Sequence, residues 1–208
     1  MRIVLATRNP HKLAELHRIL VACGLGDVDL LSVDSYPGLP EVRETGDSFE
    51  ANARLKARAV RDFTGEIAIA DDSGLAVDAL NGMPGIFSAR WSGDLAPPEQ
   101  RDWTNLRLVL AQLADVPEER RGARFVCAAV AAFPDGREFV AHGEVRGRIT
   151  RQPRGSNGFG YDPIFELPEG RTTAELDPAE KDAISHRGKA LRILVERIAE
   201  ALRPTEPT

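Results

Sequence analysis

Cysteine is scarce in this chain, and its two copies stand far apart. Cys23 and Cys127 lack the close spacing of a metal-binding cysteine motif. In a chain of 208 residues, two separated thiols are typical of small buried side chains in a reducing compartment rather than of a disulfide scaffold. We therefore expect both cysteines to lie in the core of a cytoplasmic protein.

Long apolar runs and an excess of positive charge are missing as well. No apolar run approaches the roughly 18 residues of a membrane-spanning helix, and residues 1–7 predict a strand rather than a secretion signal. We therefore expect no membrane span. The formal net charge is −5, which argues against a protein that binds along a nucleic-acid backbone. This charge still permits one small anionic ligand in a local basic cluster.

The sequence also lacks a recognisable covalent nucleophile. There is no Gly-x-Ser-x-Gly motif, and neither cysteine belongs to a catalytic motif. This absence favours direct attack by water over a covalent intermediate.

What is present is the composition of a soluble globular domain, with 42% apolar and 28% charged residues. The apolar pattern predicts, in chain order, a strand over 2–7, a helix from Pro10, a strand over 28–33, a helix over 49–63, a strand over 67–70, a helix over 97–113, strands over 125–133 and 138–149, and a helix after Ser185. Alternating strands and helices followed by a hairpin predict an α/β fold with a mixed sheet. We expect one domain, 1–208, with a loose tail over 203–208.

Two adjacent carboxylates, Asp71 and Asp72, follow the apolar run 67–70 and precede Ser73 and Gly74. We predict that the strand ends here and that the chain turns at Gly74. Carboxylates at the end of a buried strand are costly to bury without a cation or hydrogen-bond donors. The stretch is compatible with a metal-dependent site and also with an ordinary Asp-Ser-Gly turn.

Positive charge marks the start of the first predicted helix. Asn9 is a good N-cap, Pro10 suits the first helical position, and Lys12 falls in the first turn. A helix N-terminus attracts anions, so a lysine there is misplaced unless something negative faces it. Lys12 is therefore a candidate phosphate ligand, with a solvated surface lysine as the alternative.

A second basic cluster stands at the start of the last predicted helix. Ser185 can cap that helix, which places His186 and Arg187 in its first turn, with Lys181 just upstream. A ligand site and a surface basic patch both fit this cluster.

The loop 151–163 combines glycines with two aromatic residues, Phe159 and Tyr161. Glycines permit a close approach to a ligand, and an aromatic ring can stack on a base. A packed loop with a structural tyrosine is the alternative. An earlier loop, 36–46, carries Glu41 and Glu44, which solvation alone would explain.

Taken together, these segments resemble the inosine/xanthosine triphosphate pyrophosphatase family. The resemblance runs in order over about residues 2–200 and rests on six segments: Thr7 to Lys12, Glu44 to Gly46 with Phe49, Asn52 and Ala53, Ala70 to Leu75, Gly85 to Trp91, Gly158 to Pro163, and Ser185 to Arg187.

The resemblance implies hydrolysis of deaminated purine nucleoside triphosphates (ITP, dITP, XTP) to the monophosphate and pyrophosphate, by metal-assisted attack of water. It implies Mg²⁺ as cofactor, a homodimer, and an elongated mixed sheet flanked by helices, with the active-site cleft between two lobes of one bilobal domain. No nucleic-acid partner is expected.

The resemblance also implies roles for individual residues. Asp72 would be the catalytic base and a metal ligand, and Glu44 the second metal carboxylate, with Glu41 and Asp71 as the alternatives to Glu44. The substrate-binding residues would be Thr7, Arg8, Asn9, Pro10, His11 and Lys12 for the triphosphate, Ser73 and Lys181 for further contacts, and Phe159, Gly160, Tyr161, Asp162, His186 and Arg187 for the base. Arg8 stands where many members of the family carry glycine.

Donors from His186 or Arg187 would pair with the carbonyl at purine position 6 and would face an amino group in adenine, which a hydrogen-bonding site can reject. Two other functions remain as alternatives. One is a Maf-like nucleotide pyrophosphatase, which Phe159 to Asp162 and Ser185 to Arg187 fit less well. The other is a regulator that binds nucleotide without hydrolysing it.

Overall fold

A computed structural model describes residues 1–203, with the side chain of His11 excepted. Most of the predicted tail therefore lies outside the described residues. The chain divides into two compact units. Unit 1 holds Met1–Asp72, Cys127–Gly143 and Arg187–Thr208, and unit 2 holds Ser73–Val126 and Glu144–His186. The single bilobal domain over 1–208 stays a prediction.

One six-stranded sheet has the strand order β2-β1-β3-β4-β5-β6. The strands are β1 (Arg2–Leu5), β2 (Asp29–Ser32), β3 (Ile67–Val77), β4 (Gly122–Ala132), β5 (Glu138–Ile149) and β6 (Phe165–Glu166). β1 pairs in parallel with β2 and β3, whereas β6 pairs antiparallel with β5. The prediction of an α/β fold with a mixed sheet is confirmed.

The helices are α1 (Pro10–Ala22), α2 (Phe49–Thr64), α3 (Arg101–Gln112), α4 (Pro178–Ile184) and α5 (His186–Leu202). Pro10 is the first residue of α1, as predicted. Ser48 caps α2 by accepting a hydrogen bond from the backbone of Ala51, and Gly65 ends it in the left-handed conformation. Among residues 1–203, no helix combines the length and apolar character needed to cross a membrane.

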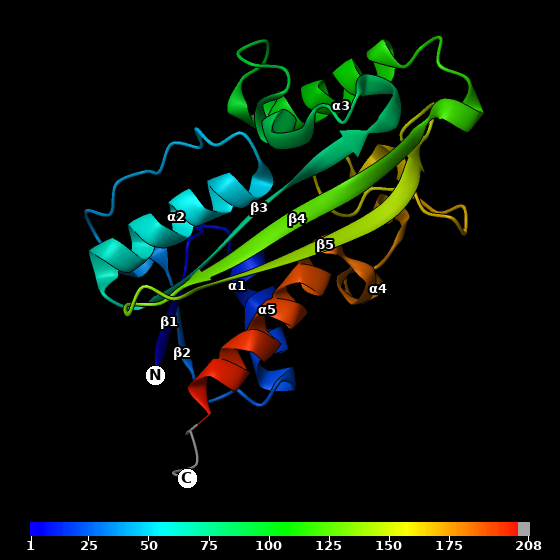
Figure 1. The fold of residues 1–208 in the computed structure, drawn as a ribbon. Helices are drawn as coiled ribbons and strands as arrows, with labels where there is room; N and C mark the ends of the chain where they lie inside the picture. The colour runs from blue at the N-terminus through cyan, green and yellow to red at the C-terminus, as the bar shows by residue number, and fades with distance from the viewer. Residues whose placement is uncertain (204–208) are drawn as a thin grey trace. The chain divides into compact units, whose positions relative to one another are not determined.

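In unit 1, the two faces of the sheet bury different helices. The buried strand residues that pack with α1 and α5 are Ile3, Leu5, Ile67, Ile69, Cys127, Ala129, Ala131 and Ala141. Those that pack on the face of α2 are Val4, Ala68, Ala70, Val130 and Ala132. The two sets alternate along each strand because successive side chains point to opposite faces. Figure 1 shows α2 and α5 on opposite sides of the strands.

The alanine-rich part of β4 is buried on both faces. Ala128, Ala129, Val130, Ala131 and Ala132 all have no exposed surface, as expected for a central strand that is covered on both faces. Cys127 is buried beside them, whereas Cys23 is half-buried and packs at the edge of the same core.

In unit 2, α3 packs on the continuation of the strands. Its buried residues Leu106 and Val109, and Leu113 just after its end, share a cluster with Leu75 of β3 and Phe125 of β4. This cluster also holds Tyr161, so it supports the aromatic loop.

The predicted turn at Asp71 to Gly74 is wrong. β3 runs without interruption from Ile67 to Val77, so both aspartates lie inside a strand. Side chains from α1, α2 and α5 supply the donors and cations that make two buried carboxylates tolerable there. With that cost offset, the apolar residues from Leu75 onward continue the strand.

Candidate functional site

Asp71 and Asp72 serve opposite faces of the sheet. They continue the alternation of β3, in which odd-numbered residues face α1 and α5 and even-numbered residues face α2. Lys12 of α1 and Arg187 of α5 bond to Asp71, whereas Asn52 and Lys56 of α2 bond to Asp72. The two carboxylates therefore belong to two different polar clusters.

Asp71 is buried between two cations. Lys12 Nζ lies 2.9 Å from both of its carboxylate oxygens, and Arg187 Nε lies 3.1 Å from Oδ2. Burial alone would raise the pKa of Asp71. The positive charges of Lys12, Arg187 and Lys56 lower this pKa by more than burial raises it, so it lies well below its usual range. The sequence predicted that a negative group faces Lys12 at the start of α1, and in the structure that group is Asp71.

Arg187 is itself held by two acids. Its side chain is 12% exposed and pairs with Asp71 and, at 3.7 Å from Nη1 to Oε2, with Glu15 of α1. Burial lowers the pKa of the guanidinium, but Asp71 and Glu15 raise it more, so Arg187 stays charged. Its predicted contact with the base stays a prediction.

Replacing Asp71 with asparagine should destabilise the protein by about 3 kcal/mol at pH 7, because buried Arg187 and Lys12 lose a shared counter-charge. A carboxyl with a lowered pKa stabilises the fold above its unfolded pKa of about 3.9 and loses this effect as the pH falls through the folded pKa. The difference from the parent should therefore shrink below about pH 4. Urea unfolding of both proteins across pH 3–7 measures it.

The matched control is Asp29→Asn, which removes an exposed partner of Arg2. It should leave stability close to that of the parent. Equal stability of the Asp71 and Asp29 variants at pH 7 would contradict a structural role for Asp71.

Asp72 shares a cation with Glu44. Lys56 Nζ lies 3.2 Å from Asp72 Oδ1 and 2.8 Å from Glu44 Oε1, and Asn52 Nδ2 donates to Asp72 Oδ2 at 3.1 Å. Burial and the nearby Glu44 raise the pKa of Asp72, and Lys56 and Asn52 oppose this shift without cancelling it. A carboxylate with a raised pKa is a better proton acceptor than an ordinary aspartate.

The chemistry of this pair fits a magnesium ion. Mg²⁺ is usually held by one or two carboxylates, with water and substrate phosphates completing its octahedron. Within the described residues there is no group of three or more His, Cys, Asp or Glu placed to hold a metal. Glu44 and Asp72 share a single ammonium group, so their oxygens already converge on one positive charge. Glu41 is exposed.

The predicted phosphate segment joins β1 to α1. Thr7 Oγ1 accepts a hydrogen bond from the backbone of Asn9 at 3.1 Å, which shapes the chain just before Pro10. Arg8 points into solvent, with 69% of its side chain exposed, and its nearest acid is Asp34 at 4.0 Å. The side chain of His11 lies outside the described residues.

In unit 2, Asp162 holds the aromatic loop together. Its Oδ2 accepts hydrogen bonds from the backbone of Phe159 and from Lys181 Nζ, and its Oδ1 accepts one from Thr173. A Cβ at Gly158 would lie 2.1 Å from Asp162 Oδ2, so only glycine permits this packing.

The two aromatic rings of the loop differ in exposure. Phe159 is 57% exposed, and Lys181 Nζ lies 4.9 Å from the centre of its ring. Tyr161 is buried and donates its hydroxyl to the backbone oxygen of Ser88. Phe159 is thus accessible for stacking, whereas the ring of Tyr161 packs as part of the core. Gly160 donates its backbone N–H to Asp102 of α3.

His186 lies at the start of α5, as the sequence predicted. Its ring stacks on Phe125 of β4, with centroids 5.0 Å apart and planes 14° from parallel. Ser185 ends α4, and Ser73 follows Asp72 on β3 and is half-buried.

Comparison with known proteins places the chain in a family. The sequence profile of the Ham1 family matches residues 3–197. The chain belongs to the Ham1 family.

Relatives and solved structures in this family cover nearly the whole chain. The dITP/XTP pyrophosphatases of Frankia alni and Streptomyces coelicolor are 58% and 54% identical to it over 205 and 203 residues, covering 97% of this chain and 99% and 98% of theirs. The Ham1 protein of Staphylococcus aureus matches with a TM-score of 0.86 at 37% identity, over 97% of this chain and 100% of that one. A nucleoside-triphosphatase, dITP/XTP pyrophosphatase, of Mycobacterium abscessus matches with a TM-score of 0.77 at 53% identity, over 98% of each chain.

Two residues that contact Asp72 in this Ham1-family protein were given no role from the sequence. Asn52 and Lys56 are four residues apart on α2, on the face that also carries buried Ala53 and Ala57. The sequence signal that could have identified these two residues is the presence of an asparagine and a lysine on a helix face that otherwise carries small apolar residues. α4 was also missed, although Asp177 and Glu180 form the capping box that starts it.

Proposed function

We propose that this Ham1-family protein hydrolyses deaminated purine nucleoside triphosphates such as dITP and XTP to the monophosphate and pyrophosphate. The observation that carries the proposal is the cluster around Asp72, a half-buried carboxylate with a raised pKa that shares a cation with Glu44 and accepts a hydrogen bond from Asn52. The names of the relatives, dITP/XTP pyrophosphatases, support the same activity.

The residues of unit 1 would bind the reacting end of the nucleotide. Asp72 and Glu44 would hold Mg²⁺, which supplies charge neutralisation for the phosphates when bound. Thr7 to Lys12 would hold the triphosphate at the start of α1. A carboxylate oxygen of Asp72 takes the proton of the attacking water, whose oxygen forms a bond to the α-phosphorus. The bond from that phosphorus to the oxygen bridging the α- and β-phosphates breaks, and pyrophosphate leaves with that oxygen.

The aromatic loop, together with His186 and Arg187, would select the base. Phe159 would stack on the purine, and Lys181 and Ser73 would contact the nucleotide. His186 and Arg187 would donate hydrogen bonds to the 6-carbonyl that hypoxanthine and xanthine carry. We also propose that the protein is a homodimer and that it acts in the cytoplasm. Analytical ultracentrifugation would measure the mass of the assembly.

Release of pyrophosphate from ITP, dITP and XTP, with ATP, GTP and UTP in parallel, tests the proposal. With Mg²⁺, we expect kcat/KM for the deaminated purine nucleotides to exceed that for ATP by at least about a hundredfold. Adenine carries an amino group in place of the 6-carbonyl, so a donor aimed at that position would have no acceptor. Removing the metal with EDTA should abolish turnover, and adding Mg²⁺ back should restore it.

Each alternative function predicts a different result in the same assay. Preference for UTP or modified pyrimidines would favour a Maf-like enzyme. Tight binding of ITP without pyrophosphate release at any Mg²⁺ concentration would favour a non-catalytic regulator.

A further inference from the structure

Asn52 is a fully buried amide in the first half of α2, with no exposed surface. A buried amide needs partners at both ends, because each unpaired polar group costs free energy. Its Oδ1 accepts a hydrogen bond from the backbone N–H of Gly46 at 2.8 Å, and its Nδ2 donates to Asp72 Oδ2 at 3.1 Å. Asn52 therefore joins the loop that carries Glu44 to the carboxylate of Asp72.

The orientation of this amide is fixed by its backbone partner. The N–H of Gly46 can only donate, so the oxygen of Asn52 must face it and the NH₂ group must face Asp72. Gly46 allows the close approach: a Cβ there would lie 2.7 Å from Ala51 Cβ and 2.8 Å from Asn52 Oδ1. The loop and the amide thus determine each other's position.

Both oxygens of Asp72 are held from the same helix. Asn52 bonds Oδ2, and Lys56, one turn later, bonds Oδ1 and also Glu44. Two donors on one rigid helix fix the plane of the carboxylate as well as its position. Asn52 differs from Lys56 in that it touches Asp72 and the backbone of the loop rather than both acids.

We infer that Asn52 is a positioning residue, which sets the Asp72 carboxylate and the Glu44 loop relative to each other for attack by water. This inference rests on the proposed function, in which Asp72 accepts the proton. An error of about 1 Å in the position of a reacting group can cost about a hundredfold in rate without weakening substrate binding. Loss of Asn52 should therefore lower kcat and leave KM nearly unchanged.

The sharpest variant is Asn52→Asp, which keeps an oxygen to accept from Gly46 and replaces the amide donor to Asp72 with a carboxylate oxygen that repels it. We expect kcat for ITP to fall about a hundredfold while KM stays within about threefold of the parent. A kcat within about threefold of the parent, in folded protein, would overturn the inference. Should Asn52→Asp fail to fold, Gly46→Ala breaks the other end of the same link and carries the same two outcomes.

Asn105 of α3 provides a matched control. It is also a buried amide, whose Oδ1 accepts from the backbone of Ser92 at 2.7 Å and whose Nδ2 donates to the backbone oxygen of Ser88 at 3.2 Å. Asn105→Asp makes the same change where no carboxylate is contacted. It should lower the melting temperature and keep kcat within about threefold of the parent, and a hundredfold fall in kcat here would make the effect of Asn52→Asp a general folding effect.

A readout without turnover separates this inference from the proposed function. Mn²⁺ binding, measured by calorimetry without nucleotide, should weaken about tenfold in Asn52→Leu, because groups that hydrogen-bond to a metal ligand typically contribute about 10- to 100-fold to metal affinity. Unchanged Mn²⁺ affinity would overturn the positioning role. If the parent releases no pyrophosphate from any nucleotide, the proposed function fails while the Mn²⁺ comparison still decides the role of Asn52.

Discussion

Replacing Asp72 with asparagine is expected to abolish turnover and to leave nucleotide binding largely intact. The amide cannot accept the proton of water and is a poor ligand for Mg²⁺, so kcat should fall by about a thousandfold or more. Pyrophosphate release at saturating ITP measures the loss, and calorimetry with ITP measures the remaining binding.

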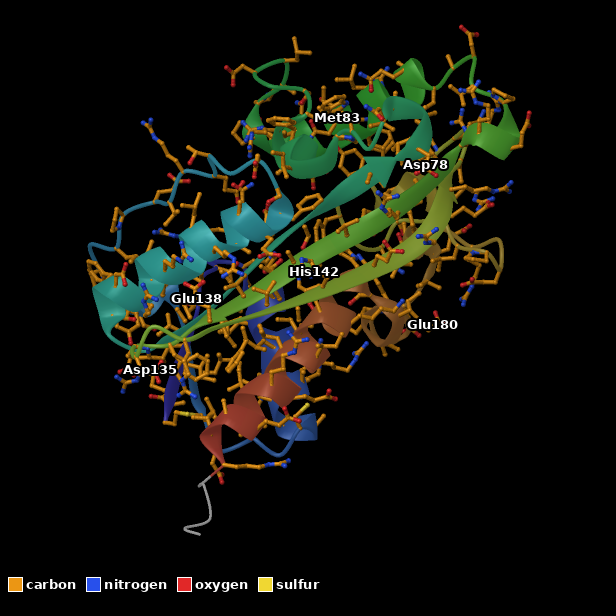
Figure 2. All side chains as sticks on the ribbon, viewed as in Figure 1. Asp78, Met83, Asp135, Glu138, His142 and Glu180 are labelled. Carbon is orange, nitrogen blue, oxygen red and sulfur yellow. The ribbon has the colours of Figure 1, made fainter. Side chains whose placement is uncertain are left out.

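The control for this variant is Asp135→Asn. Asp135 lies in the turn between β4 and β5, where Figure 2 labels it, and accepts hydrogen bonds from the backbone and the side chain of Arg137. Its removal should leave kcat unchanged. Turnover of ITP by Asp72→Asn at the rate of the parent would show that another group accepts the proton.

The second large effect is expected for Lys56→Met, which removes the cation shared by Glu44 and Asp72. The two carboxylates would then repel each other, and the pKa of Asp72 would rise further because Lys56 now lowers it. We expect kcat/KM to fall by about a hundredfold to a thousandfold, as for the loss of one charge-stabilising donor. In the absence of metal the melting temperature should fall, and Mg²⁺ should raise it more than in the parent.

Arg54→Met is the matched control for Lys56→Met. Arg54 lies two residues earlier on α2 and pairs with Glu50 and with Glu138 of β5, which Figure 2 labels. Losing its positive charge should leave kcat/KM and the response of the melting temperature to Mg²⁺ as in the parent. If Lys56→Met shows that same behaviour, Lys56 is not the counter-charge of the two acids.

Much of the fold follows from local pattern. The alternation of apolar residues, the proline at the start of α1 and the alanine run of β4 predicted elements that the structure contains. β3 was cut short because Asp71 and Asp72 are poor strand formers by themselves. Their partners Lys12, Asn52 and Arg187 come from distant parts of the sequence, so no local rule could show that the strand continues.

The residues of the candidate site could be predicted from the sequence, but their contacts could not. The acidic and basic side chains stood out by residue type, whereas nothing in the sequence showed which acid pairs with which base. Arg187 follows His186 directly, yet Arg187 bonds to Asp71 while the ring of His186 stacks on Phe125. Pairings between residues more than fifty positions apart are set by the packing of whole helices, which periodicity in the sequence does not encode.

The alternation of β3 has a practical consequence for anyone who engineers this protein or grafts its site elsewhere. A one-residue deletion just before Asp71 would exchange the two faces, presenting Asp72 to the cations of α1 and α5 and Ser73 to α2. The Asp-Asp pair therefore cannot be transplanted as a short peptide motif. The smallest portable piece is the strand together with α2 on one face and both α1 and α5 on the other, because Asp72 is held from α2 and Asp71 from α1 and α5.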